Sequence, residues 1–289
     1  MMGGILRRTV LRCCVGVLIA ASAQSGMGQV APLTATYEVS AIRFGVIPQF
    51  RVSGLIAGAD ASRRLDIPVM VWLLKGQGRN VLVDSGFHQQ KFVDQWKVQN
   101  FRSPADAVLA AGVKPEEITD VIVTHAHWDH AGGLDLFPKA IIWIQRDEYA
   151  YYTGEAWHAR NTHGGIDRDH MLTLVALNTQ GRVRFVNGDD QEIIPGIRCY
   201  TGGRHTHASQ YVGVQTAGGT AVVTSDNMYL YENLEKRVPI AQTLDAASNL
   251  KAHERIRTLA ADPALIVPGH DPAVFERFTK IADGIVRVR

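Results

Sequence analysis

The sequence predicts an α/β fold, a sheet-rich sandwich with helices on its outer faces. Short β-branched or apolar runs, bounded by Gly, Pro, Asn or Asp, recur along the chain, and segments with helical spacing lie between them. These strands and helices alternate in two similar halves. The chain shows no repeat of solenoid length and no low-complexity tract. Its length suits one α/β domain with a continuous core.

The expected strands are short apolar or β-branched runs. They cover Tyr37–Phe44, Val69–Leu74, Val81–Val83, Val121–Val123, Ile141–Ile144, Val212–Gln215 and Ala221–Val223. A helix is expected over Pro104–Ala111, because Ser103 can cap it, Pro104 suits its first turn and Gly112 can end it. A second helix is expected where residues recur at helical spacing before Pro263; these are Leu250, His253, Ile256 and Leu259.

The first 23 residues are predicted to be an export signal. Three arginines precede an apolar run over Cys13–Ala21, and Ala21-Ser22-Ala23 is a small-residue cleavage signal. The run is too short for a permanent membrane span. Arg7 and Arg8 also fit a twin-arginine signal, and both this pathway and the Sec pathway stay open. Residues 24–289 would then form the exported domain, in the bacterial periplasm or outside the cell.

The composition of the exported domain excludes several classes of protein. Removal of the three arginines lowers the formal net charge from +2 to about −1, since residues 1–23 hold no acidic residue. No basic patch indicates nucleic-acid binding, and no second candidate for a membrane span follows. Cys199 is the one remaining cysteine, so no internal disulfide can form and stability must come from the core and bound metals.

The most informative segment is His125-Ala126-His127-Trp128-Asp129-His130, which follows a strand-like run that ends at Thr124. In an extended chain, side chains two residues apart point the same way, so His125 and His127 can bind one ion together. Asp129 and His130, beyond the turn, can face a second ion. Zinc and similar divalent metals favour imidazole and carboxylate ligands, and a catalytic site keeps one position open for water. The spacing therefore predicts a hydrolytic site with two metal ions.

This segment resembles the HxHxDH motif of the metallo-β-lactamase superfamily. The family's other ligands have counterparts in the expected order, namely His205 after two glycines, Asp226 after Thr224-Ser225, and His270 in Pro268-Gly269-His270-Asp271. The resemblance covers about Val69 to His270 and implies an αββα sandwich with two zinc or other divalent ions along one edge of the paired sheets. The implied ligands are His125, His127 and His205 for the first ion, Asp129, His130 and His270 for the second, and Asp226 as a bridge.

The chain departs from the family pattern around the third histidine. The family more often has Gly-His-Thr-Pro-Gly-His there, whereas Arg204 precedes His205 and His207 follows two residues later. Because Thr206 follows His205 as in the common motif, His205 is the expected ligand and His207 is expected behind the ligands or at the surface. Asp84 matches the family's Asp-Thr/Ser-Gly element, either as a turn-forming aspartate or as an acceptor that orients a ligand histidine.

Tyr229 is the residue that indicates a substrate class. N-acyl-homoserine lactonases of this superfamily have a catalytic tyrosine three residues after the bridging aspartate, as Tyr229 follows Asp226. The alternative is an aromatic residue that packs in the core. The resemblance implies opening of a lactone, above all an N-acyl-homoserine lactone, by a hydroxide that bridges the two ions. Tyr229 would donate to the developing oxyanion, and Asp129 would pass a proton to the leaving oxygen.

Other functions could use the same metals. Thioesterase, pyridoxolactonase and phosphotriesterase activities stay open, because the same hydroxide can attack carbonyl or phosphoryl centres. A β-lactamase of this superfamily usually lacks the bridging aspartate, so Asp226 counts against that activity. A periplasmic zinc-binding protein without turnover belongs to a different class, which the complete ligand set disfavours.

The substrate is expected to be a small molecule with an apolar tail. Four aromatic residues are candidate walls for that tail, although the core is favoured for the first two: Phe87, Tyr151, Trp128 and Trp157. The segment Glu155–His170 is rich in charge and poor in core residues, and it is expected to be an exposed loop. Its position between the first and third ligand segments makes it a candidate lid or an uncommitted surface loop.

Overall fold

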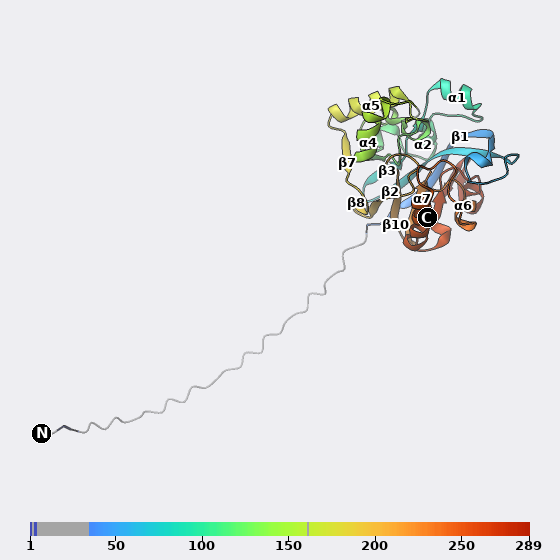
Figure 1. The fold of residues 1–289 in the computed structure, drawn as a ribbon. Helices are drawn as coiled ribbons and strands as arrows, with labels where there is room; N and C mark the ends of the chain where they lie inside the picture. The colour runs from blue at the N-terminus through green and yellow to red at the C-terminus, as the bar shows by residue number, and fades with distance from the viewer. Residues whose placement is uncertain (2, 5–34, 161) are drawn as a thin grey trace. The chain divides into compact units, whose positions relative to one another are not determined.

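The computed structural model describes residues 1, 3–4, 35–160 and 162–289, and the folded domain lies within residues 35–289 (Figure 1). The arginines, apolar run and cleavage site of the predicted export signal lie outside the described residues. Within the described part of the chain, no helix is both long enough and apolar enough to cross a membrane.

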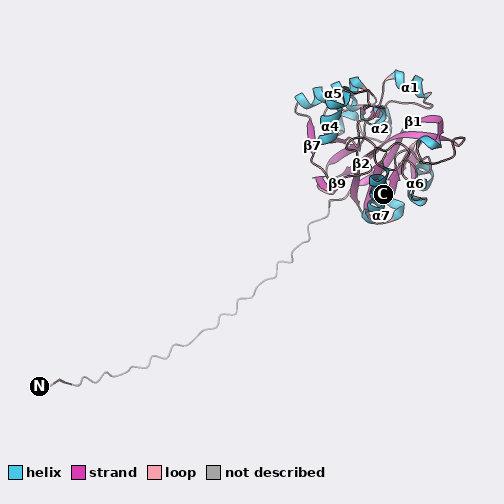
Figure 2. Ribbon diagram, viewed as in Figure 1, coloured by secondary structure: helices cyan, strands magenta, loops and turns pink. Residues whose placement is uncertain are grey.

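Two mixed sheets form the centre of the fold, with helices around them (Figure 2). The strands are β1 Glu38–Arg51, β2 Arg64–Gly76, β3 Arg79–Val83, β4 Gly86–Phe87, β5 Asp120–Ile122, β6 Ile141–Gln145, β7 Val183–Val186, β8 Gln191–Ile194, β9 Ile197–Thr201, β10 Gln210–Thr216, β11 Gly219–Ser225, β12 Ile266–Pro268, β13 Thr279–Ala282 and β14 Ile285–Arg287. The larger sheet has the order β13-β14-β1-β2-β3-β5-β6-β7, and the smaller sheet has the order β12-β11-β10-β9-β8. Parallel pairing joins β3, β5, β6 and β7 in the larger sheet and β11 with β12 in the smaller.

Helices cover the outer face of each sheet. The α-helices are α1 Gln90–Trp96, α2 Pro104–Ala110, α3 Trp128–Ala131, α4 Arg146–Tyr152, α5 Arg168–Thr179, α6 Tyr231–Glu235, α7 Ala246–Leu259 and α8 Val274–Arg277. Short 3₁₀ turns are η1 Val52–Gly54, η2 Pro115–Glu117, η3 Leu134–Leu136, η4 Glu155–Trp157 and η5 Pro263–Leu265. Val108 of α2 and Leu174 of α5 pack in one cluster with Val121 of the larger sheet, while Ile256 of α7 packs with Val222 of the smaller. The layers are therefore α, β, β and α, as predicted.

Strand β2 shows how the sequence builds the two apolar layers. Val71 and Leu73 face the helices outside the larger sheet, whereas Trp72 and Leu74 face the smaller sheet and contact residues such as Val212. Side chains alternate between the two faces of a strand, and both faces are buried over the centre of β2, so residues 67–74 form an unbroken apolar run.

The predicted runs all lie in or overlap observed strands, and both predicted helices are present as α2 and α7. The exposed-loop prediction for Glu155–His170 is wrong at its C-terminal end. Asp167 caps α5 by accepting hydrogen bonds from the main-chain N–H groups of Asp169 and His170, and the His170 side chain is buried. The cap makes the polar residues part of a helix start, which the charge-based reading missed.

Candidate metal centre

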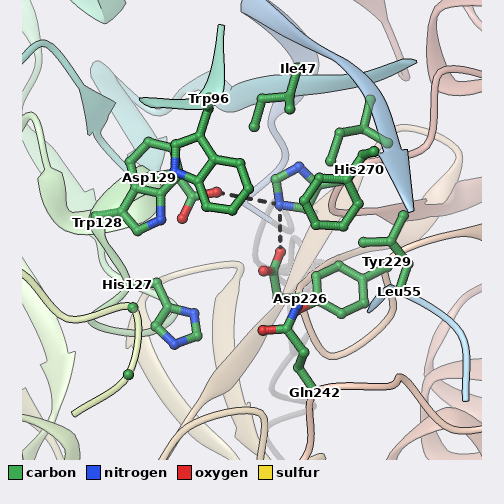
Figure 3. A pocket seen from close by; sticks show the side chains of 14 residues that line it. Ile47, Leu55, Trp96, His127, Trp128, Asp129, Asp226, Tyr229, Gln242 and His270 are labelled. Carbon is green, nitrogen blue, oxygen red and sulfur yellow. Dashed lines mark ion pairs between the residues drawn. The ribbon is translucent and has the colours of Figure 1, made fainter. Parts of the chain in front are cut away.

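The seven predicted ligands meet where strands of both sheets end. The segment His125–His130 follows β5, Asp226 follows β11, and His270 lies two residues beyond β12. His205 lies in the loop between β9 and β10. The carboxyl ends of strands are a common place for ligand sites in α/β folds, because the loops there converge. Figure 3 shows four of these side chains around one cavity, namely His127, Asp129, Asp226 and His270.

The first group consists of His125, His127, His205 and Asp226. His127 Nδ1 lies 3.1 Å from His125 Nε2 and 2.9 Å from His205 Nε2. Asp226 Oδ2 lies 3.7 Å from His125 Nε2 and 3.4 Å from His205 Nε2. Zinc bonds of about 2.0–2.1 Å in a tetrahedron separate the ligand atoms by about 3.3 Å, so these four atoms have the spacing of a zinc site.

The second group consists of Asp129, His130 and His270 and is joined to the first by Asp226. Asp226 Oδ1 lies 3.4 Å from His130 Nε2 and 3.1 Å from His270 Nε2. Asp129 Oδ2 lies 3.6 Å and 3.7 Å from the same two nitrogens. The two oxygens of Asp226 thus face different groups, which is the arrangement of a carboxylate that bridges two ions.

The outer ring nitrogens of the histidines contact protein acceptors. His205 Nδ1 donates to the main-chain oxygen of Gln242 at 2.7 Å, and His270 Nδ1 donates to that of Pro68 at 2.9 Å. The outer nitrogen of His127 faces the Gly164–Gly165 segment, since a Cβ atom on Gly165 would lie 2.9 Å from its Nε2 atom. Because the proton of each ring lies on the outer nitrogen, the inner nitrogen presents a lone pair to the centre.

Asp84 fixes the remaining two rings. Its Oδ2 atom lies 2.8 Å from His130 Nδ1 and accepts from Thr124 Oγ1 at 2.9 Å, while Thr124 Oγ1 lies 3.0 Å from His125 Nδ1. Of the two roles considered for Asp84, the contacts favour the one that orients histidines.

The donor set fits divalent metal ions. His130 Nε2 and Asp226 Oδ1 are buried and make no hydrogen bond within the described part of the chain. Unpaired buried polar atoms are costly, and a cation between these converging lone pairs and carboxylate oxygens would satisfy them. Imidazole nitrogen with carboxylate oxygen suits zinc and related metals.

Burial and charge keep the first group in a form that binds metal. Burial lowers the pKa of His125 and His127, and the neighbouring histidines lower it further. For Asp226, burial raises the pKa, but attraction to the protonated forms of His130 and His270 outweighs burial, and the pKa lies well below its ordinary value; a bound cation would take the place of these protons. Neutral imidazole and ionised carboxylate are the forms that coordinate a metal.

Close backbone packing supports Asp226. Ser225, the residue before it, has a left-handed backbone with φ of 46°, which is rare for a residue with a side chain. A Cβ atom on Gly269 would lie 2.6 Å from Asp226 Oδ1 and 2.8 Å from the Ser225 carbonyl oxygen. Only glycine leaves room for the Asp226 carboxylate at this position.

Glu148 is a site residue that the sequence did not reveal. This fully buried side chain accepts from the main-chain N–H of Ala126 at 2.9 Å and of Ala208 at 2.7 Å, and from Thr206 Oγ1 at 2.6 Å. Ala126 lies between the first two histidines, and Thr206 follows the third. One carboxylate therefore ties together both segments that carry the histidines of the first group. Its acidic position in the first turn of α4 gave the only local signal.

A cavity of about 230 Å³ opens onto both groups (Figure 3). Its apolar wall comes from several segments and consists of Ile47, Phe50, Leu55, Ile67, Trp96 and Trp128. Trp96 and Trp128 stack with ring centroids 5.7 Å apart. Of the four aromatic residues considered as walls, Trp128 alone lines this cavity, and Phe87 lies fully buried in the core.

The segment between α4 and α5 contributes to the cavity through Gly164 and Gly165. Trp128 donates its main-chain N–H to the Gly165 carbonyl at 2.9 Å. A Cβ atom on Gly165 would lie 2.7 Å from the His127 ring, so the segment packs directly on a predicted ligand. Trp157 of this segment does not line the cavity and stacks on His163.

The structure separates the two histidines of the third ligand segment. His205 belongs to the first group, whereas the His207 ring stacks on Tyr151 with centroids 4.0 Å apart.

Tyr229 is buried in the cavity wall, and its hydroxyl lies 3.4 Å from His205 Nδ1. That nitrogen already donates to Gln242, so the phenol proton stays free for another acceptor. Burial raises the pKa of Tyr229 well above its ordinary value, and the nearby carboxylates add to this.

Comparison with known proteins identifies the family. A model of the metallo-beta-lactamase superfamily matches residues 65–270. The chain belongs to this superfamily. It is therefore a metal-dependent hydrolase, and the predicted family and fold are confirmed.

Several relatives of this superfamily member are lactonases by name. An N-acyl homoserine lactonase of Bacillus cereus is 27% identical over 223 residues, which are 72% of this chain and 82% of that protein. The N-acyl homoserine lactonase AttM of Rhizobium radiobacter is 26% identical over 243 residues, covering 77% and 88%. A solved structure of a quorum-quenching N-acyl homoserine lactone lactonase has a TM-score of 0.69 at 23% identity, covering 86% and 98%. The solved structure of AidC, a dizinc quorum-quenching lactonase, has a TM-score of 0.64 at 15% identity, and the match covers 88% of this chain and 97% of AidC.

Proposed function

We propose that the chain is a dinuclear zinc lactonase that opens N-acyl-homoserine lactones. The observation that carries this proposal is the cavity itself, in which two ligand groups bridged by Asp226, the Tyr229 hydroxyl and an apolar aromatic wall meet. The names of the relatives support the same substrate class. An acyl tail suits the wall formed by Phe50, Trp96 and Trp128.

The proposed ligands are His125, His127, His205, Asp129, His130, His270 and the bridging Asp226. Two divalent ions bound by them would polarise a carbonyl group and make hydroxide available from water near neutral pH. The protein orients the ligand rings through Asp84 and main-chain carbonyls, and Glu148 holds the segments that carry the first group.

Tyr229 is proposed to stabilise the transition state. Its O–H group has no short hydrogen bond to the described residues and can donate to the lactone carbonyl oxygen as that atom gains negative charge. Because the phenol is held in the cavity wall before substrate binds, little reorganisation is needed.

Asp129 is proposed to move the proton. Its side chain is partly exposed to the cavity, while the other predicted carboxylate ligand, Asp226, is almost fully buried. Addition of water to the carbonyl carbon gives a tetrahedral intermediate, and collapse of this intermediate breaks the bond to the ring oxygen. The first proton that the water loses would pass to Asp129 and then to the ring oxygen, which leaves as an alcohol. The product is a hydroxy acid, whose carboxyl group releases the second proton to the solvent near neutral pH.

A substrate panel tests the proposal. The zinc-loaded chain from Gln24 is given N-hexanoyl-homoserine lactone, a thioester, a phosphotriester and a β-lactam, and kcat/KM is measured for each. We expect the highest value for the lactone. A higher value for any of the other three would reject lactonase as the main activity.

Tyr229→Phe tests the residue-level mechanism. Loss of the hydroxyl should lower kcat for the lactone roughly ten- to a thousand-fold, with both ions retained and KM changed far less. Tyr211→Phe is the matched control, because Tyr211 is a buried tyrosine of β10 that packs with Tyr200 and does not line the cavity. Unchanged lactone turnover in Tyr229→Phe would make Tyr229 a packing residue.

We also propose that the chain is exported by the Sec or the twin-arginine pathway and that residues 1–23 are removed from the exported protein. The motivating observations are the three arginines, the apolar run and Ala21-Ser22-Ala23. N-terminal sequencing of protein recovered from the periplasm should start at or near Gln24. An intact Met1 on that protein would contradict the proposal.

A further inference from the structure

Gln242 is a polar side chain of the cavity that none of the proposed steps uses. We propose that it is a specificity residue whose amide oxygen accepts a hydrogen bond from an N–H group of the substrate. This inference rests on the proposed lactonase function and narrows it. Among lactones, the site would favour those that carry an acylamino group beside the ring carbonyl over those with a plain alkyl tail.

The main chain of Gln242 is fixed relative to the first ligand group. Its carbonyl oxygen accepts from His205 Nδ1 at 2.7 Å. The preceding residue, Ala241, donates its N–H to the carbonyl of Leu55 at 3.0 Å, which ties the segment to the turn after β1. The side chain therefore starts from a point held on two sides, as a binding residue requires.

The side-chain amide has a defined orientation. Its Nε2 atom donates to the carbonyl oxygen of Gly54 at 3.0 Å. A carbonyl can only accept, so the NH₂ group must face Gly54 and the amide oxygen must point the other way. In Figure 3 the Gln242 amide lies beside Asp226 and Tyr229, with its oxygen turned toward the side of the cavity where His127 lies. The oxygen accepts no hydrogen bond from the residues that the structure describes.

The other lining side chains leave this role to Gln242. Within the described part of the chain, the cavity side chains with polar groups are Tyr229, Trp96 and Trp128, whose O–H and N–H groups can donate, four predicted ligands, and Gln242. An ester group offers only acceptors, so a plain lactone gives the Gln242 oxygen nothing to bind. An acylamino substituent adds one N–H, and the Gln242 oxygen can accept from it.

Gln242→Met tests this inference, because methionine keeps the length of the side chain and removes the amide. The substrates are N-hexanoyl-homoserine lactone and γ-decalactone, a γ-lactone with an alkyl tail and no N–H. We expect KM for the first to rise about three- to ten-fold, the scale of one hydrogen bond that replaces a bond to water. The KM of γ-decalactone should change less than two-fold, and the content of two ions should stay, since the main-chain acceptor of His205 is retained.

Gln95→Met is the matched control. Gln95 is an exposed glutamine of α1 that borders a neighbouring hollow and does not line the metal cavity. It should leave KM unchanged for both lactones. Calorimetric titration with the two ring-opened acids, N-hexanoyl-homoserine and 4-hydroxydecanoate, repeats the comparison without turnover. The affinity of N-hexanoyl-homoserine should be lower for Gln242→Met than for the wild type, and the affinity of 4-hydroxydecanoate should be the same for both proteins.

The outcomes separate this inference from the proposed function. A wild-type chain that opens neither lactone with two ions bound overturns the lactonase proposal, and the inference falls with it. A wild-type chain that opens N-hexanoyl-homoserine lactone while Gln242→Met shows no change, or an equal rise in KM for both lactones, overturns the inference alone. A rise in KM for N-hexanoyl-homoserine lactone, without a similar rise for γ-decalactone, supports the inference.

Discussion

The two ligand groups share Asp226 but are held by different parts of the fold. In the second group, the His130 ring is fixed by Asp84 directly after β3, and the His270 ring by the carbonyl of Pro68 within β2. In the first group, the His205 ring donates to the carbonyl of Gln242 and the His127 ring packs against Gly165, and both partners are loop residues. Strands in the middle of a sheet open rarely, whereas loops open locally at low cost. His130, His270 and, through Thr124, His125 are therefore held by residues of the larger sheet, whereas His127 and His205 depend on loop segments that Glu148 ties together.

Asp226→Ala should have the largest effect, because Asp226 is the one side chain that belongs to both groups. Metal content should fall from two ions per chain to one or none, and lactone turnover should drop at least about a thousand-fold. Elemental analysis of the loaded protein measures the first effect. A fully loaded wild type with one ion would reject the dinuclear site altogether.

His205→Ala should disrupt the first ligand group and leave the second ligand group intact. The first ion should be lost together with activity, while the second ion stays bound through Asp129, His130 and His270. His207→Ala is the matched control, since its ring stacks on Tyr151 outside the cavity, and it should keep most of the activity and both ions. The reverse pair of phenotypes would move the ligand to His207.

Glu148→Gln and Asp84→Asn test whether the two ligand groups are held separately, and they should have smaller effects on metal binding than loss of a ligand. Each exchange keeps the shape of the side chain but turns an NH₂ group toward donors that need an acceptor. Glu148→Gln should weaken binding of the first ion about ten- to a hundred-fold and leave the second nearly unchanged, and Asp84→Asn should weaken the second ion most. Zinc affinities from competition with a chelator measure both. Equal losses at both groups in Glu148→Gln would show that the two groups are not held separately.

The ligand segment could be predicted because its information is local. His125, His127, Asp129 and His130 lie within six residues, and in an extended chain His125 and His127 already point to the same side. The strands could be predicted equally well, because a strand that is buried on both faces requires a short apolar run, and turn residues mark its ends. The exposed-loop prediction failed at His170 because a helix cap uses the same polar residues as a loop.

The sequence by itself therefore determined the layered fold, the family, the candidate ligands and their order along the chain. The tertiary structure decided how they are held and what surrounds them. Glu148 lies 22 residues from Ala126 and 60 from Ala208, and Gln242 lies 37 from His205, so no local pattern could join them. The cavity wall likewise combines Phe50, Trp96 and Trp128 from separate elements. Side chains at such separations become neighbours only when the sheets pack, because contacts between distant segments depend on the whole fold and not on local propensity.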